Sequence, residues 1–193
     1  MWLCVGGGGL WSGVADFDHT TCGTAATQRR AFGDNNDGMD VFTHDGKMLL
    51  VVKNEYANPK ILWSNNESKR PISDDDIVKG MIAHCVSIME IANTDGKWTV
   101  VKDSPYNRRL TAKTEMTLTG SAAGHDLLKT EADPTVTKLL GTWSNCGNWI
   151  TPWGTYLTCE ADFNVYFSPS EGIKDLPPKF KRYDVSNKEF GYN

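Results

Sequence analysis

Alternation of apolar and polar residues forms the first clear pattern along the chain. Residues 39–56, MDVFTHDGKMLLVVKNEY, carry β-branched and aromatic residues on both sides of the pair Asp45 and Gly46. A two-residue hairpin turn needs positive φ angles, and Asp and Gly are among the residues that supply them. Residues 85–104, CVSIMEIANTDGKWTVVKDS, repeat this arrangement around Asp95 and Gly96. The pattern predicts two antiparallel β-hairpins with the same Asp-Gly-Lys turn.

The rest of the pattern predicts short strands and one helix. Strands are expected at 116–120, 138–144 and 155–163, where apolar residues lie between turn residues. Segment 73–85 is expected to be helical, because Ser73 is a suitable N-cap, three aspartates follow it, and Ile77, Met81 and Ile82 share a face. Residues 1–30 and the proline-bearing stretch 168–193 show no period, and we expect an irregular segment and a connecting loop there. Short strands with one helix near 73–85 predict an all-β fold, in which residues 31–193 form part of a β-propeller with antiparallel blades.

Composition and charge narrow the classes of partner. Apolar residues make up 39% of the chain and charged residues 23%, which excludes global disorder. We find no apolar run close to the roughly 18 residues of a membrane-spanning helix. The net charge is −4 and lysines and arginines do not cluster, so neither nucleic acid nor an anionic membrane is an expected partner. The N-terminal apolar stretch lacks the basic and hydrophobic regions of a secretory signal.

Two of the five cysteines lie in the stretch NCGNWITPWGTYLTCE, residues 145–160. Strand alternation places Cys159 with Leu157 on one face and Glu160 on the other. Cys146 lies in an Asn-Cys-Gly turn context that can direct a side chain into a cleft. A disulfide between the cysteines would close a loop of about 14 residues and contribute about 3 kcal/mol. Disulfide, buried thiols and metal ligand all remain open from the residues alone.

Several oxygen-rich or cationic residues are further candidates. The stretch DNNDGMD, residues 34–40, offers hard ligands suited to calcium, although turn formation alone would explain its composition and is the favoured interpretation. Glu55 follows the apolar run LLVV, where a carboxylate either contributes to a site or is simply solvated. Arg108, Arg109 and His125 are candidates for binding an anion, because guanidinium groups match phosphate oxygens. The GxSxG, CxxC, HExxH and P-loop motifs are absent from the sequence.

Six blocks in order resemble the PhoX-type alkaline phosphatases over about residues 31–167. The blocks are FGDNNDGMDVF, LLVVKNEYANP, the helix followed by HCVSIMEI, WTVVKDSPYNRRLT, LTGSAAGHDLLKT and NCGNWITPWGTYLTCEADFN. The resemblance implies a six-bladed β-propeller that hydrolyses phosphate monoesters through a centre of ferric iron and calcium. It also implies a protein exported to the periplasm or beyond, which we expect to act as a monomer on a small phosphate ester.

The resemblance assigns roles to particular residues. It implies that Cys146 is an iron ligand and that Glu55 is a metal-site residue, and we carry Glu160 as a third. Cys159 is then expected to be a buried thiol on the core face of its strand, and a disulfide with Cys146 would contradict the assignment. With a phosphate ester as substrate, Arg108, Arg109 and His125 become candidate substrate-binding residues.

The chain also departs from the family pattern. Asn54 stands where a histidine is usual, Asn148 and Trp149 replace two glycines, and Ala161 replaces an acid. A bulky Trp149 beside the cluster would narrow the site. The resemblance further implies later blocks beyond Asn193, so the chain is expected to hold about half of the propeller and to have little or no activity alone. The alternative functions are a non-catalytic calcium-binding propeller module and, less favoured, a lactonase or diesterase on the same scaffold.

Overall fold

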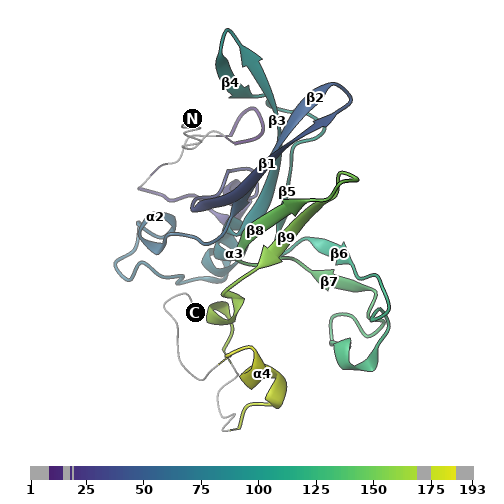
Figure 1. Cartoon of the computed structure of the whole chain (residues 1–193). Coiled ribbons are helices and arrows are strands. Elements are labelled where there is room, and N and C mark those ends of the chain that lie inside the picture. The colour runs from purple at the N-terminus through teal and green to yellow at the C-terminus, as the bar shows by residue number, and fades with distance from the viewer. Residues whose placement is uncertain (1–8, 15–17, 19, 169–174, 186–193) are drawn as a thin grey trace.

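The computed structural model describes residues 9–14, 18, 20–168 and 175–185 of the chain (Figure 1). Predictions that concern residues 1–8, including the absence of a signal segment, lie outside the described residues. The strands are β1 (Asn36–His44), β2 (Lys47–Asn54), β3 (Cys85–Thr94), β4 (Lys97–Val100), β5 (Arg108–Thr111), β6 (Glu115–Thr117), β7 (Lys138–Leu140), β8 (Asn145–Ile150) and β9 (Tyr156–Glu160). The α-helices are α1 (Ala25–Gln28), α2 (Pro59–Leu62), α3 (Asp74–Ala83) and α4 (Pro178–Arg182), and η1 (Asp126–Leu128) and η2 (Phe163–Tyr166) are 3₁₀ turns.

The fold is mostly antiparallel β-sheet with few helices, as the apolar pattern predicts. The largest sheet has the order β1-β2-β3-β4, and β5 pairs with the other half of β3. Two further sheets are the hairpins β6–β7 and β8–β9, of which β8 lies beside β1 (Figure 1). One apolar core on the main sheet is formed by Leu10, Leu50, Val52, Met89 and Ile91.

Both predicted hairpins are confirmed. The first turn has φ angles of 50° at Asp45 and 72° at Gly46, and His44 pairs with Lys47. The second has 53° at Asp95 and 82° at Gly96. The Asp-Gly pairs therefore form turns with positive φ at both positions, which match the twist of the strands that they join.

Helix α3 is confirmed, and its apolar face is only partly buried. Ile77 is 52% exposed, whereas Lys79, Gly80, Ile82 and Ala83 are buried. A Cβ added at Gly80 would lie 3.0 Å from the Trp63 ring, so the absence of a side chain at Gly80 lets the helix pack closely against that ring. Helix α1 packs against α3, and the Lys79 ammonium on the buried face donates to the Cys22 carbonyl oxygen that precedes α1.

The N-cap of α3 gives a first test of local stability. The Ser73 Oγ accepts a hydrogen bond from the Asp76 backbone N–H at 3.2 Å. Ser73→Ala removes that acceptor, and we expect it to lower the free energy of unfolding by about 1 kcal/mol. Urea denaturation measures this loss. Ser73→Gly is the control, because glycine at an N-cap costs only a few tenths of a kcal/mol; equal losses for both variants would contradict a capping role.

Several boundaries and elements differ from the sequence prediction. Strands β6, β7 and β9 are shorter than the predicted runs, and β5 and β8 were not predicted. The stretch 1–30 includes α1 and contributes the fully buried Leu10 to the core, and 168–193 includes α4. Such short elements are set by packing against the sheet, which leaves little periodic signal in the sequence.

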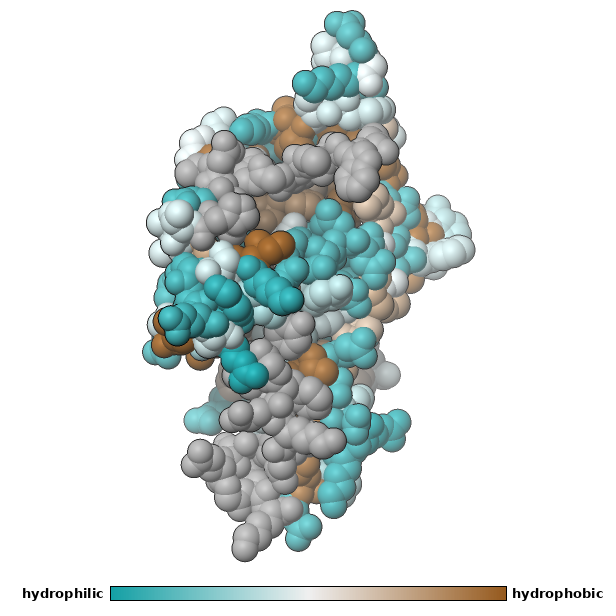
Figure 2. Space-filling view, turned by 90° about the vertical axis from the view of Figure 1, so that its left-hand side faces the viewer, coloured by the Kyte–Doolittle hydropathy of each residue, from teal (hydrophilic) through white to brown (hydrophobic). Residues whose placement is uncertain are grey.

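The molecular surface is mixed in character. Figure 2 shows one face on which hydrophilic residues predominate and hydrophobic ones lie in small groups. Among the described residues, none of the helices combines the length and hydropathy needed to cross a bilayer.

Candidate metal centre

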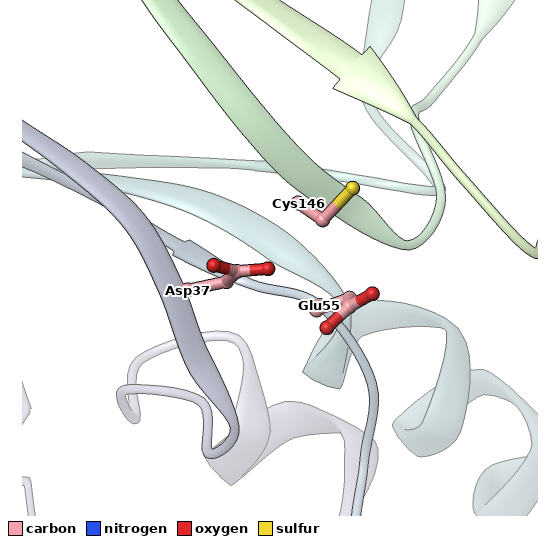
Figure 3. A group of neighbouring side chains, drawn as sticks. All are labelled: Asp37, Glu55 and Cys146. Carbon is pink, nitrogen blue, oxygen red and sulfur yellow. The ribbon is translucent and has the colours of Figure 1, made fainter.

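Three potential metal ligands from distant parts of the sequence meet beside the main sheet. The ligand atoms of Asp37, Glu55 and Cys146 all lie within 4.8 Å of one another. Figure 3 shows the three side chains extending into the same space, from β1, from the segment after β2 and from β8. Glu55 and Cys146 are half-buried and Asp37 is exposed, so the group lies near the molecular surface rather than in the core. The structure thus brings together two of the three metal-site residues that the sequence suggests.

Two β-bulges present the ligands. Pairs of β1 with β2 run from Asn36↔Asn54 to Met39↔Val52, so three steps along β1 match two along β2. Asp37 and Gly38 therefore share one position opposite Lys53. A bulge of this kind turns side chains away from the regular alternation of a strand.

The same arrangement recurs in the second hairpin. Pairs of β8 with β9 run from Asn145↔Glu160 to Asn148↔Thr158, which again leaves one extra residue. Cys146 and Gly147 oppose Cys159 in this bulge. Each bulge thus consists of a potential ligand followed by a glycine.

Gly38 allows the two bulges to approach each other. A Cβ at this position would lie 2.5 Å from the Cys146 carbonyl oxygen and 2.1 Å from the Asn148 Oδ1. The Asn148 Nδ2 also donates a hydrogen bond to the Asp40 Oδ2, at 3.3 Å. The missing side chain at Gly38 therefore sets the distance between the strands that carry Asp37 and Cys146.

Glu55 is placed by the end of β2. Its backbone N–H donates to the Asn35 carbonyl oxygen at 3.1 Å. The preceding Asn54 is fully buried, and its Nδ2 donates to the Asp34 carbonyl oxygen at 3.1 Å and to the Asn36 Oδ1 at 2.6 Å. Asn54 points away from Glu55 in the strand alternation, so this departure from the family pattern fastens β2 to β1.

The electrostatic environment of the centre favours a cation. Burial raises the pKa of the Glu55 carboxyl, and the neighbouring charges of Asp37 and Asp162 raise it further. Such crowding of acidic groups disfavours ionisation unless a positive charge compensates it. Two carboxylates and one thiol make a donor set that suits ferric iron, and the carboxylates alone suit calcium. The residues present therefore fit a metal ion.

Of the two predictions for the cysteine pair, the absence of a disulfide is confirmed and the burial of Cys159 is wrong. Cys146 and Cys159 are both free thiols, which removes the disulfide interpretation. Cys159 is exposed and is not a buried thiol on a core face. Tyr156 instead turns inward, where it packs against the cluster of Val51, Val86 and Ile88 and its ring lies 5.9 Å from the ring of Phe42. The inner face of β9 is therefore the one opposite to Cys159.

Glu160 and Trp149 do not join the group of three. The Glu160 Oε1 accepts a hydrogen bond from the Trp143 backbone N–H at 2.7 Å, and its side chain is exposed at the end of β9. Trp149 is 70% exposed, so its side chain points largely into solvent and does not narrow the centre. Through this hydrogen bond, the Glu160 carboxylate stabilises the segment that connects β7 to β8.

The three candidate anion-binding residues differ in the hydrogen bonds that their side chains already make. The Arg109 guanidinium donates to the carbonyl oxygens of Gln28 and Ile82, at 2.5 and 3.0 Å, and to the Cys85 Sγ at 2.8 Å. Binding of phosphate by Arg109 would require these bonds to break.

Arg108 is exposed and has one long hydrogen bond to the Tyr106 carbonyl oxygen, at 3.5 Å. His125 is exposed, and its Nδ1 accepts from the Leu127 N–H at 3.1 Å. Substrate binding by the three stays a prediction.

Asp37 is the member of the centre that sequence reasoning did not single out. It lies in DNNDGMD, where turn formation explains the acidic composition, yet only residues 34 and 35 form a bend and 36–40 belong to β1. Within the stretch, Asp34 accepts from the Asn58 N–H at 3.1 Å, and only Asp37 faces Glu55 and Cys146. The Asp-Gly pair inside a strand is the one signal of a bulge that the sequence offers.

Comparison with known proteins identifies the family of this fold and centre. The family "Alkaline phosphatase PhoX" matches residues 3–193, which is almost the whole chain. The chain belongs to the PhoX alkaline phosphatase family.

A solved PhoX structure shares the fold. The PhoX of Pseudomonas fluorescens, determined in complex with vanadate as a transition state analogue, is 40% identical and superposes with a TM-score of 0.89. The match covers 97% of this chain and 33% of the Pseudomonas chain, so this PhoX-family chain spans about one third of that relative. No curated protein sequence matches the chain.

Proposed function

We propose that the chain provides part of the site of a metal-dependent phosphatase that hydrolyses small phosphate monoesters. The observation that carries the proposal is the convergence of Asp37, Glu55 and Cys146 in a PhoX-family fold. The vanadate complex of the Pseudomonas relative supports it, because vanadate imitates a phosphoryl group in transfer. The natural ester would be a small molecule.

We propose ferric iron and calcium as the cofactors. The Cys146 thiolate is a soft ligand that suits iron, while Asp37 and Glu55 offer the hard oxygens that either ion accepts. When bound, these ions would neutralise the charge of a phosphate ester and polarise its phosphorus. The contribution of this chain is to hold the ligands on two rigid hairpins and one strand end, so that the site needs little rearrangement on binding.

The wider setting is also a proposal. We place the sheets as antiparallel blades of a β-propeller, for which the repeated Asp-Gly-Lys hairpins and the β8–β9 hairpin are the support. The protein would act as a monomer in the periplasm or outside the cell. Because the solved relative is about three times as long as the matched part, we expect the 193-residue chain alone to show little or no turnover.

Binding of metals and vanadate by the purified chain tests the proposal without requiring turnover. The chain is dialysed against ferric iron and calcium, separated from free metal and analysed for both elements, and orthovanadate is then titrated. We expect both metals to be retained and vanadate to bind only the metal-loaded chain. Absence of iron, together with the absence of vanadate binding, would overturn the phosphatase proposal.

The same measurement decides the alternative function. A non-catalytic calcium-binding module is favoured by one observation, that the group holds two carboxylates and is half open to solvent. Calcium retained without iron or vanadate would support that module. Rapid hydrolysis of p-nitrophenyl phosphate by the chain alone would support the phosphatase and refute the expected low turnover.

A further inference from the structure

Lys53 is a buried cation at the point where the two ligand-bearing bulges meet. It belongs to β2, two residues before Glu55, and its side chain is fully buried. Residues two apart in a strand point to the same side, so Lys53 and Glu55 share a face and Asn54 lies on the other. In the pairing of β1 with β2, Lys53 is the single residue opposite Asp37 and Gly38.

The ammonium of Lys53 contacts the second bulge. Its Nζ donates a hydrogen bond to the carbonyl oxygen of Gly147, the residue that follows Cys146. The same Nζ lies 5.4 Å from the centre of the Tyr156 ring on β9, within the range of a cation–π interaction. Lys53 therefore links the two bulges: it lies opposite the Asp37 bulge of β1 and donates a hydrogen bond to the Cys146 bulge of β8.

Two potential metal ligands lie beside Lys53. Asp37 lies opposite Lys53 in the strand pairing, and Cys146 immediately precedes the glycine whose carbonyl oxygen accepts from the Lys53 ammonium. A buried charge is costly unless opposite charges or hydrogen bonds compensate it. Two potential metal ligands are thus among the groups that make a cation acceptable at this place.

A second buried lysine shows what a purely structural role looks like. Lys79 on α3 is also buried, and its Nζ donates to the Cys22 carbonyl oxygen at 3.0 Å. The negative charges that act on Lys79 are the carboxylates of Asp76 and Asp75, which are not members of the group of three. Lys53 and Lys79 are both buried ammonium groups that donate to a backbone carbonyl oxygen, but only Lys53 lies beside the potential metal ligands.

We infer that Lys53 is a positioning residue of the metal centre, which fixes the Cys146–Gly147 bulge against β2 and balances the negative charge of the ligands. Without the ammonium, the Gly147 carbonyl loses its partner and the bulge is free to move Cys146 away from Glu55. The inference rests on the proposed metal centre, but not on iron or on turnover.

The test uses divalent cobalt, because its thiolate complexes have a charge-transfer absorption that reports the sulfur ligand directly. We expect the wild-type chain to show this absorption and Lys53→Met to bind cobalt about 10- to 100-fold more weakly with a diminished band, the effect found when groups that support metal ligands are lost. Lys53→Arg keeps the charge and the donors and should restore most of the affinity. Lys79→Met is the matched control, with wild-type affinity and band.

The outcomes separate the inference from the proposed function. Unchanged cobalt affinity and band in Lys53→Met, or an equal loss in Lys79→Met, would overturn the positioning role. Should Lys53→Met lose its far-ultraviolet circular dichroism, Lys53→Gln replaces it under the same criterion. A wild-type chain that binds cobalt through Cys146 but binds neither iron nor vanadate would refute the phosphatase proposal. The role of Lys53 in positioning Cys146 would still be tested by the cobalt measurements.

Discussion

A chain that carries Cys146→Ser is expected to bind ferric iron at least about 100-fold more weakly than the wild-type chain. Loss of the partners behind a metal ligand costs about 10- to 100-fold in affinity, and loss of the ligand itself should cost no less. Serine is nearly isosteric, but its hydroxyl stays protonated near neutral pH and is a poor substitute for a thiolate. Equilibrium dialysis with metal analysis measures the change, and calcium should be affected far less than iron.

The hairpin itself provides the control for this variant. Cys159 lies on the facing strand, is exposed, and is not one of the group of three. Cys159→Ser should keep the iron affinity of the wild-type chain within a few-fold. Equal losses in the two variants would show that general damage to the β8–β9 hairpin, and not loss of a ligand, explains the effect.

Gly38→Ala is expected to damage both the fold and the centre. The new Cβ would collide with the Cys146 carbonyl oxygen, which belongs to the backbone and cannot rotate away. Relief requires β8 to move away from β1, and overpacking of this kind costs about 1–3 kcal/mol of stability. Because the movement separates Cys146 from Asp37, metal affinity should fall together with the free energy of unfolding.

The glycine of the other bulge is the matched comparison. A Cβ at Gly147 would meet only the Cβ of Cys159, at 4.0 Å, which is ordinary contact. Gly147→Ala should therefore leave stability within about 0.5 kcal/mol of the wild-type value. Urea denaturation and cobalt titration of both variants check the pair, and a Gly38→Ala chain as stable as Gly147→Ala would refute the close approach of the strands.

The sequence predicted the parts of the fold that depend on local chemistry. The Asp-Gly turns and the start of α3 follow from backbone preferences of a few residues, and both are confirmed. The burial of the α3 face could not be predicted, and the orientation of Cys159 was wrong, for one common reason. Periodicity shows which residues share a face, but what covers that face depends on distant segments, such as α1 for the helix and the main sheet for Tyr156.

The candidate centre shows the same division. Glu55 and Cys146 could be named as metal-site residues from the sequence because both lie in blocks that resemble the PhoX family. Asp37 was only one of several hard ligands in DNNDGMD and Lys53 was not named, since the place of both depends on a one-residue shift in strand pairing. A buried lysine in a strand also has no signature of its own in a sequence.

The two bulges have a consequence for how such a centre is gained or lost in descent. Each consists of one residue in excess, and that excess turns a ligand toward its partners. Deletion of one residue from either place would restore regular strand pairing, so the sheets could persist while the ligand disappeared. Among related chains, an alignment gap at residues 36–39 or 145–148 would therefore mark a loss of metal chemistry more surely than substitutions in the surrounding strands.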